Sequence, residues 1–363
     1  MLGGIHTNNI NFDNLIIRPG DRVLITGAGG FIGSKVVETV LAYGFTNLRC
    51  LVRPSGDLAK LNNIISLFNG ANVELLEGNL LSVDDCRKAT KNVSVIFHLA
   101  AGIEKTFPGC FMNSAVTTRN LLDAVVQDGT IRRFVNVSSF AVYSNVKIRR
   151  RGVLNETCEL ETKFMERYDS YCFGKAKQDQ IVMEYGRKHN IPFVIVRPGV
   201  VYGPKARGPI HSRVGIGTFG IFLHLGGPNR IPLTYIDNCA DAIVLAGVRK
   251  GVDGEVFNIV DDFLPTSRTF LKMYKKNVKY FKSIYVPYRI FYLLCYLWER
   301  YSKWSDGQLP LAFNRRKCSA EWKGNRYSNA KAKELLGWTP NVSVDEGMKR
   351  HFEYFRRLES SNA

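Results

Sequence analysis

The chain has 363 residues, of which 45% are hydrophobic and 23% charged, and its formal net charge is +18 at pH 7. This composition excludes a disordered chain and suffices for one large core with a smaller appended part. The residues from Leu264 onward hold 20 Lys and Arg against 8 Asp and Glu. A basic surface attracts nucleic acid, anionic lipid or phosphorylated ligands. No nucleic-acid-reading motif accompanies the charge, so we expect no nucleic-acid partner.

Eight cysteines are scattered along the chain, and no two of them have the C-x-x-C spacing of a metal or redox site. Unpaired thiols of this kind are typical of a reducing compartment. The first residues also lack the basic and then apolar pattern of a secretory signal. We therefore expect a cytoplasmic protein without a bound metal.

A glycine-rich turn follows the first apolar run of the chain, at residues 23–26. Gly27, Gly30 and Gly33 have the spacing T-G-x-x-G-x-x-G, and a helical pattern begins directly after Gly30. Such a turn lets backbone N–H groups approach a pyrophosphate, whose negative charge the helix N-terminus favours. The turn therefore predicts a dinucleotide site.

Up to Pro198, short apolar runs alternate with helical patterns. This alternation predicts a Rossmann-type α/β fold, a doubly wound parallel sheet with helices on both faces. The predicted strands are 23–26, 48–52, 73–76, 95–99, 134–137 and 193–197. The predicted helices are 31–43, 58–67, 83–90, 113–127 and 171–189.

After Pro198 the alternation breaks, and residues 199–230 are rich in glycine and proline. A strand at 231–235, a helix at 238–248 and a strand at 255–260 are expected to return to the sheet. The remainder is mostly helical in pattern. We thus predict an NAD(P)-binding domain at residues 1–198 plus about 231–261. A smaller, mostly helical substrate-binding domain would comprise residues 199–230 and 262–363.

The longest aromatic and apolar stretch lies at residues 284–304. Its uncharged core, 290–298, is bounded by Arg289 and Glu299, which makes it shorter than the roughly 20 residues of a spanning helix. A buried helix of the smaller domain is the favoured interpretation. The alternatives are peripheral contact with a membrane surface and a wall for a lipophilic substrate.

A tyrosine and a lysine four residues apart share one face of a helix, where the ammonium group would lower the tyrosine pKa. Tyr171 opens a long helical pattern after the loop that follows the fifth predicted strand, so we favour Tyr171 and Lys175 as an acid/base pair. Ser139, at the end of that strand, would hydrogen-bond a substrate oxygen or else cap the loop. Three Tyr-x-x-x-Lys pairs occur in all: Tyr143/Lys147, Tyr171/Lys175 and Tyr327/Lys331.

Taken together, these motifs resemble the extended short-chain dehydrogenase/reductase family, most closely its NAD-dependent epimerase/dehydratase branch. The motifs are, in order, Thr26-Gly27-x-x-Gly30-x-x-Gly33, His98-Leu-Ala-Ala101, Ser138-Ser139, Tyr171-x-x-x-Lys175 and Arg197-Pro-Gly-Val-Val-Tyr-Gly-Pro204. The resemblance covers about residues 20–350.

The resemblance implies a role for each matching residue. Tyr171 would be the general acid/base, Lys175 would also bind the nicotinamide ribose, and Ser139 would orient the substrate oxygen. His98 would be a structural strand residue. Homodimers would form through the helices at 113–127 and 171–189. The cofactor would contact Gly27, Gly30, Phe31, Ile32, Gly33, Arg53, Asn79, Leu80, Ala100, Ala101, Lys175 and Pro198.

The end of the second predicted strand bears on the cofactor. An acidic residue there would bind the ribose of NAD, whereas an arginine accommodates the 2′-phosphate of NADP. Arg53 stands at this place, so NADP is favoured over NAD. Asn79 replaces an aspartate that the family often places near adenine, which is a mild departure.

Two other departures narrow the reaction. Phe140 and Ala141 stand where family dehydratases carry an Asp-Glu pair, so sugar 4,6-dehydration is not expected. Ser114 and the pair Thr117-Thr118 replace most of an Asn-x-x-Gly-Thr motif of many epimerases, which weakens the expectation of nucleotide-sugar positioning.

Three functions are left open. The favoured one is an NAD(P)-dependent oxidoreductase that transfers hydride between nicotinamide C4 and a secondary alcohol or ketone, with a lipophilic substrate. The second is a nucleotide-sugar epimerase with retained NAD. The diphosphate of its substrate would then be bound by Arg207, His211, Arg213 and Arg230. The alternative for these four residues is that they are solvated surface residues. The third is a non-catalytic NADP-binding protein on the same fold.

Overall fold

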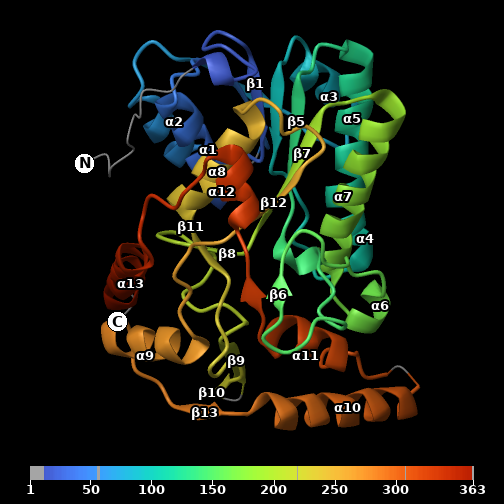
Figure 1. The fold of residues 1–363 in the computed structure, drawn as a ribbon, viewed down its shortest axis with the longest axis vertical. Helices are drawn as coiled ribbons and strands as arrows, with labels where there is room; N and C mark the ends of the chain where they lie inside the picture. Colours follow the sequence, from blue (N-terminus) through green and yellow to red (C-terminus); the bar gives the residue numbers. More distant parts are fainter. Residues whose placement is uncertain (1–11, 55–57, 219, 307, 362–363) are drawn as a thin grey trace.

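A central sheet of seven parallel strands organises the computed structural model, which describes residues 12–54, 58–218, 220–306 and 308–361 (Figure 1). The strand order is β12-β7-β5-β4-β1-β2-β3. The chain therefore winds outward from β1 in one direction and then from β4 in the other, which confirms the predicted doubly wound fold. The strands are β1 (Val23–Thr26), β2 (Asn47–Val52), β3 (Asn72–Glu77), β4 (Val95–His98), β5 (Arg133–Val137), β7 (Phe193–Pro198) and β12 (Val256–Ile259).

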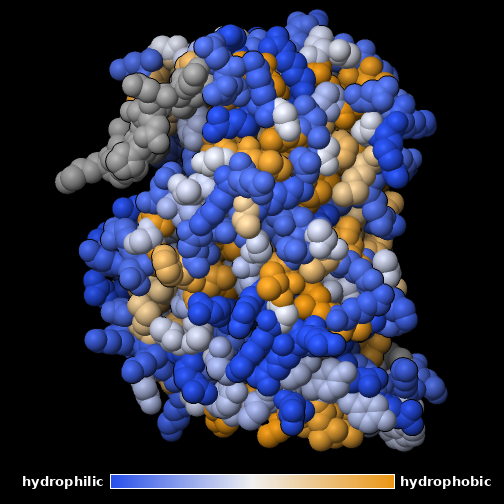
Figure 2. All heavy atoms as spheres, in the orientation of Figure 1, coloured by the Kyte–Doolittle hydropathy of each residue, from blue (hydrophilic) through white to orange (hydrophobic). Residues whose placement is uncertain are grey.

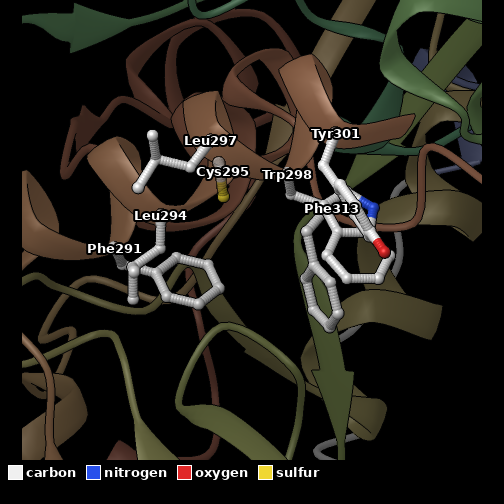
Figure 3. A pocket seen from close by; sticks show the side chains of 7 residues that line it. All are labelled: Phe291, Leu294, Cys295, Leu297, Trp298, Tyr301 and Phe313. Atoms are coloured by element: carbon white, nitrogen blue, oxygen red, sulfur yellow. The ribbon is translucent and has the colours of Figure 1, made fainter. Parts of the chain in front are cut away.

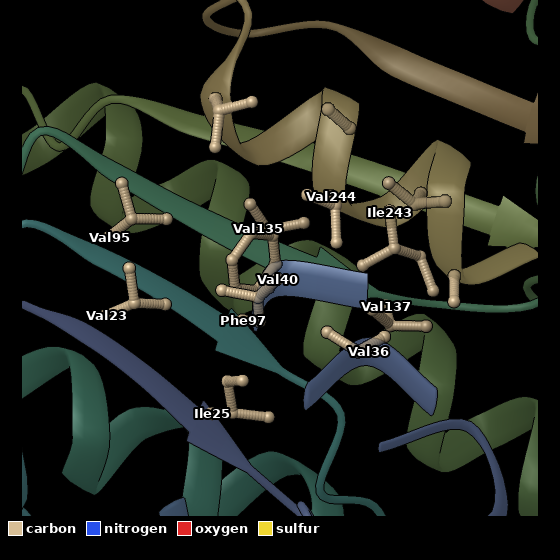
Figure 4. Packing of buried hydrophobic residues seen from close by; sticks show 14 of the residues in the cluster. Val23, Ile25, Val36, Val40, Val95, Phe97, Val135, Val137, Ile243 and Val244 are labelled. Carbon is tan, nitrogen blue, oxygen red and sulfur yellow. The ribbon is translucent and has the colours of Figure 1, made fainter. Parts of the chain in front are cut away.

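Helices cover both faces of this sheet because successive residues of each strand point to opposite sides. Val23 and Ile25 of β1 pack in the cluster that includes α1 and α8 (Figure 4). Leu24, between them, packs in the cluster of α3, α5 and α7. The helices of this part are α1 (Phe31–Ala42), α2 (Ala59–Ile65), α3 (Val83–Thr90), α4 (Phe107–Cys110), a π-helical segment (Phe111–Val116), α5 (Thr117–Asp128), α6 (Phe164–Arg167), α7 (Ser170–His189) and α8 (Ile236–Val248).

The strand predicted at residues 231–235 does not join the central sheet, so this expectation was wrong. Residues of β11 (Leu233–Tyr235) pair instead with β8 (Val200–Tyr202), which continues the chain just beyond β7. The outer edge of β7 is already paired with β12. Because that edge offers no free backbone groups, β11 hydrogen-bonds to the next available strand.

Most segments after Pro198, apart from α8 and β12, build a second assembly at the carboxyl side of the sheet. Strands β9 (Gly215–Thr218) and β10 (Ile221–His224) form a small sheet with β13 (Ser283–Tyr285), which joins two parts of the chain distant in sequence. Ala332, Leu336 and Trp338 pack in the central cluster, so residues 332–338 return to the main sheet. The remaining elements are β6 (Val153–Leu154), β14 (Arg326–Tyr327), α9 (Ser267–Asn277), α10 (Tyr288–Trp304), α11 (Arg315–Trp322), α12 (Ala330–Leu336) and α13 (Val344–Ser361).

Helix α10 lies along the lower margin of the molecule in Figure 1, where β13 leads into it and α11 packs beside it. In the described ranges, none of the helices combines the length and apolar character that a bilayer span requires.

Candidate active site

The glycine turn packs its backbone so closely that side chains are excluded at two points. Gly27 has φ +68°, and a Cβ on Gly33 would lie 2.0 Å from the carbonyl oxygen of Gly27. Helix α1 begins directly after Gly30, which offers no side-chain cap. The N-terminus of α1 thus presents backbone N–H groups in a cradle free of side chains, which fits a dinucleotide pyrophosphate.

The other predicted cofactor residues lie at the carboxyl ends of neighbouring strands. Arg53 follows β2 and is exposed, and Asn79 follows β3 with its side-chain oxygen accepting from the Leu81 N–H at 3.0 Å. A Cβ on Gly27 would lie 3.0 Å from the Ala100 nitrogen, so the loop after β4 supports the turn. Further members of the predicted set are Phe31 and Ile32 at the start of α1, Leu80 after β3, Ala101 after β4 and Pro198 at the end of β7.

Tyr171 and Lys175 lie in the first turns of α7, against the end of β5. The Lys175 ammonium donates to the carbonyl oxygen of Val137 at 2.7 Å, and Tyr171 is hydrogen-bonded with Ser139. The Ser139 hydroxyl also accepts from the Ala141 N–H at 3.1 Å, so it caps the short helical turn that follows. The structure therefore brings Ser139, Tyr171 and Lys175 together.

Burial shifts the pKa of both titratable groups of this set. It raises the pKa of Tyr171 above its ordinary value, and the hydrogen bond with Ser139 opposes part of that rise. A net lowering of the Tyr171 pKa was predicted from Lys175, and this was wrong because burial dominates. Burial lowers the pKa of Lys175 to about 8, against the influence of Asp179.

A buried polar network lies beneath the pair, and sequence reasoning missed it. Asp179 is one helical turn beyond Lys175 and forms an ion pair with Arg197 at 3.0 Å, with the two side chains 0% and 2% exposed. Arg197 donates to the Tyr143 hydroxyl at 3.0 Å, which donates to Asn258 at 2.8 Å. The i, i+4 spacing of Lys175 and Asp179 was the available signal.

His98 is structural, as predicted. Its ring nitrogens lie 2.9 Å from the hydroxyls of Thr26 and Thr118. Burial, helped by the charge of Lys175, lowers its pKa to about 3. A neutral imidazole held on both sides can fix the ends of β1 and β4 but is unsuited to proton transfer.

The two rival tyrosine–lysine pairs are separated by their own partners. Lys147 is ion-paired with Glu159 at the surface, whereas Tyr143 is bound in the buried network. Lys331 is ion-paired with Glu255. Tyr327 is within hydrogen-bonding distance of Arg213. Neither pair therefore forms an acid/base unit.

The four basic residues predicted for substrate do not converge. Arg207 and His211 line a pocket of about 290 Å³, whose other walls include Tyr202 and Phe270. Arg213 donates to the Ala320 carbonyl at 3.1 Å. Arg230 donates to the Leu264 carbonyl at 2.8 Å and is exposed.

The positions at which the chain departs from its family pattern have structural roles. Phe140 is buried and packs against Tyr143 and Tyr327. The Ser114 hydroxyl accepts from the Gly102 N–H at 2.9 Å. Thr118 binds His98, as described above. These contacts within the protein account for the residue types at these positions, so no contact with a substrate is needed to explain them.

The doubly wound sheet, the glycine turn and the group at the end of β5 define an enzyme of the extended short-chain dehydrogenase/reductase class. In agreement, residues 23–260 match the model of the NAD dependent epimerase/dehydratase family. The chain belongs to this family.

Curated relatives of several activities are similar to the chain. Sterol-4-alpha-carboxylate 3-dehydrogenase, decarboxylating, of Mus musculus is 24% identical over 94% of this chain and 93% of its own length. A trifunctional UDP-glucose 4,6-dehydratase, epimerase and reductase of Arabidopsis thaliana is 28% identical over 66% of this chain. Cinnamoyl-CoA reductase 1 of Petunia hybrida is 29% identical over 54% of it. The matches span only 36% and 59% of the latter two relatives.

Among solved structures, UDP-glucuronic acid 4-epimerase of Bacillus cereus, in complex with NAD, has the same fold. It is 23% identical, with a TM-score of 0.69 over 93% of this chain and 99% of its own.

Proposed function

We propose that the protein is an NAD(P)-dependent oxidoreductase that interconverts a secondary alcohol and a ketone on a lipophilic molecule. The observation that carries this proposal is the placement of Ser139, Tyr171 and Lys175 at the carboxyl end of β5. When bound, the cofactor supplies or accepts the hydride.

Tyr171 acts as the general acid/base in this proposal. Because burial raises its pKa, the hydroxyl holds its proton at neutral pH and can donate it to a ketone oxygen. Ser139 would orient that oxygen through its hydroxyl. Lys175, fixed on the Val137 carbonyl, would hold the nicotinamide ribose and supply positive charge beside Tyr171.

NADP is the cofactor that we favour, because Arg53 is exposed at the end of β2. Two findings support NAD instead, namely the description of the family and the NAD bound to the Bacillus cereus epimerase. Titration of the protein with NADPH and with NADH distinguishes them. We expect Arg53→Ala to weaken NADPH and leave NADH unchanged, and equal affinity of the original chain for both cofactors would overturn the preference.

A lipophilic substrate is supported by two observations. The mouse sterol dehydrogenase aligns with nearly the whole of both chains. The pocket beside Arg207 and His211 has mainly apolar walls, which suits an apolar body with one anionic group. Most residues that line the pocket belong to residues 199–230 and 262–363, which we propose as the substrate domain, and Ile231 and Leu233 complete it.

A nucleotide-sugar epimerase is the second candidate, favoured by the fold of the Bacillus cereus enzyme. Retention of cofactor separates the two reactions. Consumption of free NADPH with a lipophilic ketone supports the reductase. Cofactor that survives dialysis, together with interconversion of sugars without added NADPH, would refute it.

Replacement of Tyr171 by Phe tests the catalytic proposal. We expect turnover to fall by about 10²–10⁴-fold, whereas Tyr185→Phe, farther along the same helix, retains activity. The Tyr185 hydroxyl donates to Asp123 at the surface. Unchanged turnover of the Tyr171 variant would refute Tyr171 as the general acid/base, and absence of turnover in the original chain would leave a non-catalytic NADP-binding protein.

We also propose a homodimer formed through α5 and α7, which pack side by side on one face of the sheet. Sedimentation of the purified chain measures its mass, and a monomer at all concentrations would contradict this assembly.

A further inference from the structure

Helix α10 carries a row of exposed apolar side chains along its outer side. Six residues of this row are between 50% and 77% exposed. Their spacing places them on one face of the helix. We call this row the α10 stripe, and it consists of Ile290, Leu293, Leu294, Leu297, Tyr301 and Trp304. The expectation of a buried helix at this segment therefore holds for one face of α10 and is wrong for the other.

The stripe is exposed although α10 is firmly attached to the protein. On the opposite face, Phe291 and Cys295 are buried, and Phe291 packs edge to face on Trp322. The Trp298 ring nitrogen donates to the Pro310 carbonyl at 3.0 Å, and Glu299 forms an ion pair with Arg315 at 2.8 Å. The inner face thus satisfies its own contacts, and the outer face lacks a cover within the described chain.

Beside the stripe, the surface contains a shallow apolar groove of about 330 Å³. Figure 3 shows that side chains of α10 and Phe313 together surround it. Leu294, Leu297 and Tyr301 of the stripe belong to its lining. An apolar groove of this kind can accept a flexible hydrocarbon chain.

The segment that leads into and through most of α10 is rich in positive charge. Residues 263–298 contain seven Lys and Arg and no Asp or Glu. Near the end of α10, Arg300 and Lys303 are balanced in number by Glu299, which is ion-paired with Arg315, and by Asp306. Figure 2 shows hydrophobic residues at the lower margin of the molecule, where Figure 1 places α10 and β13, with hydrophilic residues next to them.

We propose that the α10 stripe binds the surface of a membrane that contains anionic lipids. An interfacial helix buries an apolar face rich in Leu and Trp while its Lys and Arg contact the headgroups. At 17 residues, α10 is about 25 Å long, so it lies in the interface. A second copy of the chain would place the same basic surface against itself, which is electrostatically unfavourable.

Vesicle binding of the full chain tests this proposal. We expect binding to phosphatidylcholine–phosphatidylserine vesicles, weaker binding to phosphatidylcholine alone, and loss of that difference at high salt. Leu293→Glu combined with Leu297→Glu should weaken binding at least about tenfold. The matched control is Leu67→Glu, because Leu67 is 57% exposed and follows α2.

Two further variants separate the apolar and basic contributions. Lys272→Ala and Lys276→Ala, on α9, should each lower affinity for anionic vesicles about fivefold without changing binding to neutral ones. Trp304 is 77% exposed, so its fluorescence should shift to the blue on vesicle binding. In Trp304→Phe this shift should disappear.

Three results would overturn the proposal. The first is failure of the original chain to bind either kind of vesicle. The second is equal vesicle binding by the Leu293/Leu297 variant and the original chain. The third is that the original chain binds no vesicle but forms a dimer, and that the Leu293/Leu297 variant is monomeric. The last result would assign the stripe to a second copy. None of these readouts depends on the proposed reaction, so the catalytic proposal stands or falls separately.

Discussion

Beneath the proposed catalytic group the protein buries charges, whereas on α10 it exposes apolar side chains. Asp179 and Arg197 are almost fully buried, and the α10 stripe is at least half exposed. Burial of ions costs several kcal/mol unless they are paired, and an exposed leucine forgoes about 1.5–3 kcal/mol of burial free energy. Stability alone favours apolar side chains inside and charged side chains outside, and both regions depart from this arrangement. The departure points to a function for each region.

The difference between the regions lies in their partners. Asp179, Arg197 and Tyr143 of the buried network are hydrogen-bonded to one another or to Asn258 inside the chain, so the network can position Lys175 on α7. The α10 stripe has no such cover in the described residues, so the partner that we propose for it comes from outside the chain. Stability measurements should thus respond strongly to changes in the first region and weakly to changes in the second.

The largest expected loss of stability follows Asp179→Asn, which would leave Arg197 buried without its counter-charge. We expect the free energy of unfolding to fall by about 3–5 kcal/mol, as measured by denaturant titration. The exposed pair of Asp84 with Arg87 supplies the control, since Asp84→Asn should cost less than about 1 kcal/mol. Equal effects of the two variants would remove the distinction between buried and exposed charge.

A smaller effect is expected at the glycine turn. In Gly33→Ala the new Cβ would meet the Gly27 carbonyl, and forcing it in costs about 1–3 kcal/mol. We expect the dissociation constant of the cofactor to rise roughly ten- to hundredfold in a fluorescence titration. Gly29→Ala is the matched control, because nothing lies within 4 Å of a Cβ built there. Similar affinities for both variants would show that close packing of the turn is unimportant.

The sequence predicted the glycine turn and the Tyr171–Lys175 pair, but it did not predict the buried network or the exposed face of α10. The glycine turn and the Tyr171–Lys175 pair depend on contacts between residues a few positions apart, so spacing alone revealed them. The network joins Asp179 to Tyr143 and Asn258, which lie on separate segments and meet only when the sheet assembles. The hydropathy of residues 284–304 showed an apolar segment but could not tell which face the protein would cover.

The pairing of β11 has a similar explanation. Its apolar pattern predicted a strand correctly, but the choice of neighbour depended on β12 having occupied the edge of β7. Competition between strands for one edge is a property of the assembled sheet. The basic residues Arg213 and Arg230 likewise bind backbone carbonyls that no local pattern could identify.

A pH titration tests the buried region further through His98. Burial lowers its pKa to about 3, compared with about 6.5 in an unfolded chain. Between these values the unfolded state binds a proton that the native state excludes, so the free energy of unfolding falls as pH falls. We expect His98→Gln to reduce this slope by about 1.4 kcal/mol per pH unit. Parallel curves for the two proteins would contradict a buried neutral imidazole.

The smallest effect on stability is expected on the α10 stripe. Leu293→Ala removes an exposed side chain, so the free energy of unfolding should change by less than about 0.5 kcal/mol. Phe291→Ala, two residues away on the buried face, should cost about 3–5 kcal/mol. If both variants were strongly destabilised, Leu293 would be covered in solution by the protein itself or by a second copy. A large effect at Phe291 alone would mean that the stripe contributes nothing to folding, and its apolar character would then be available for binding.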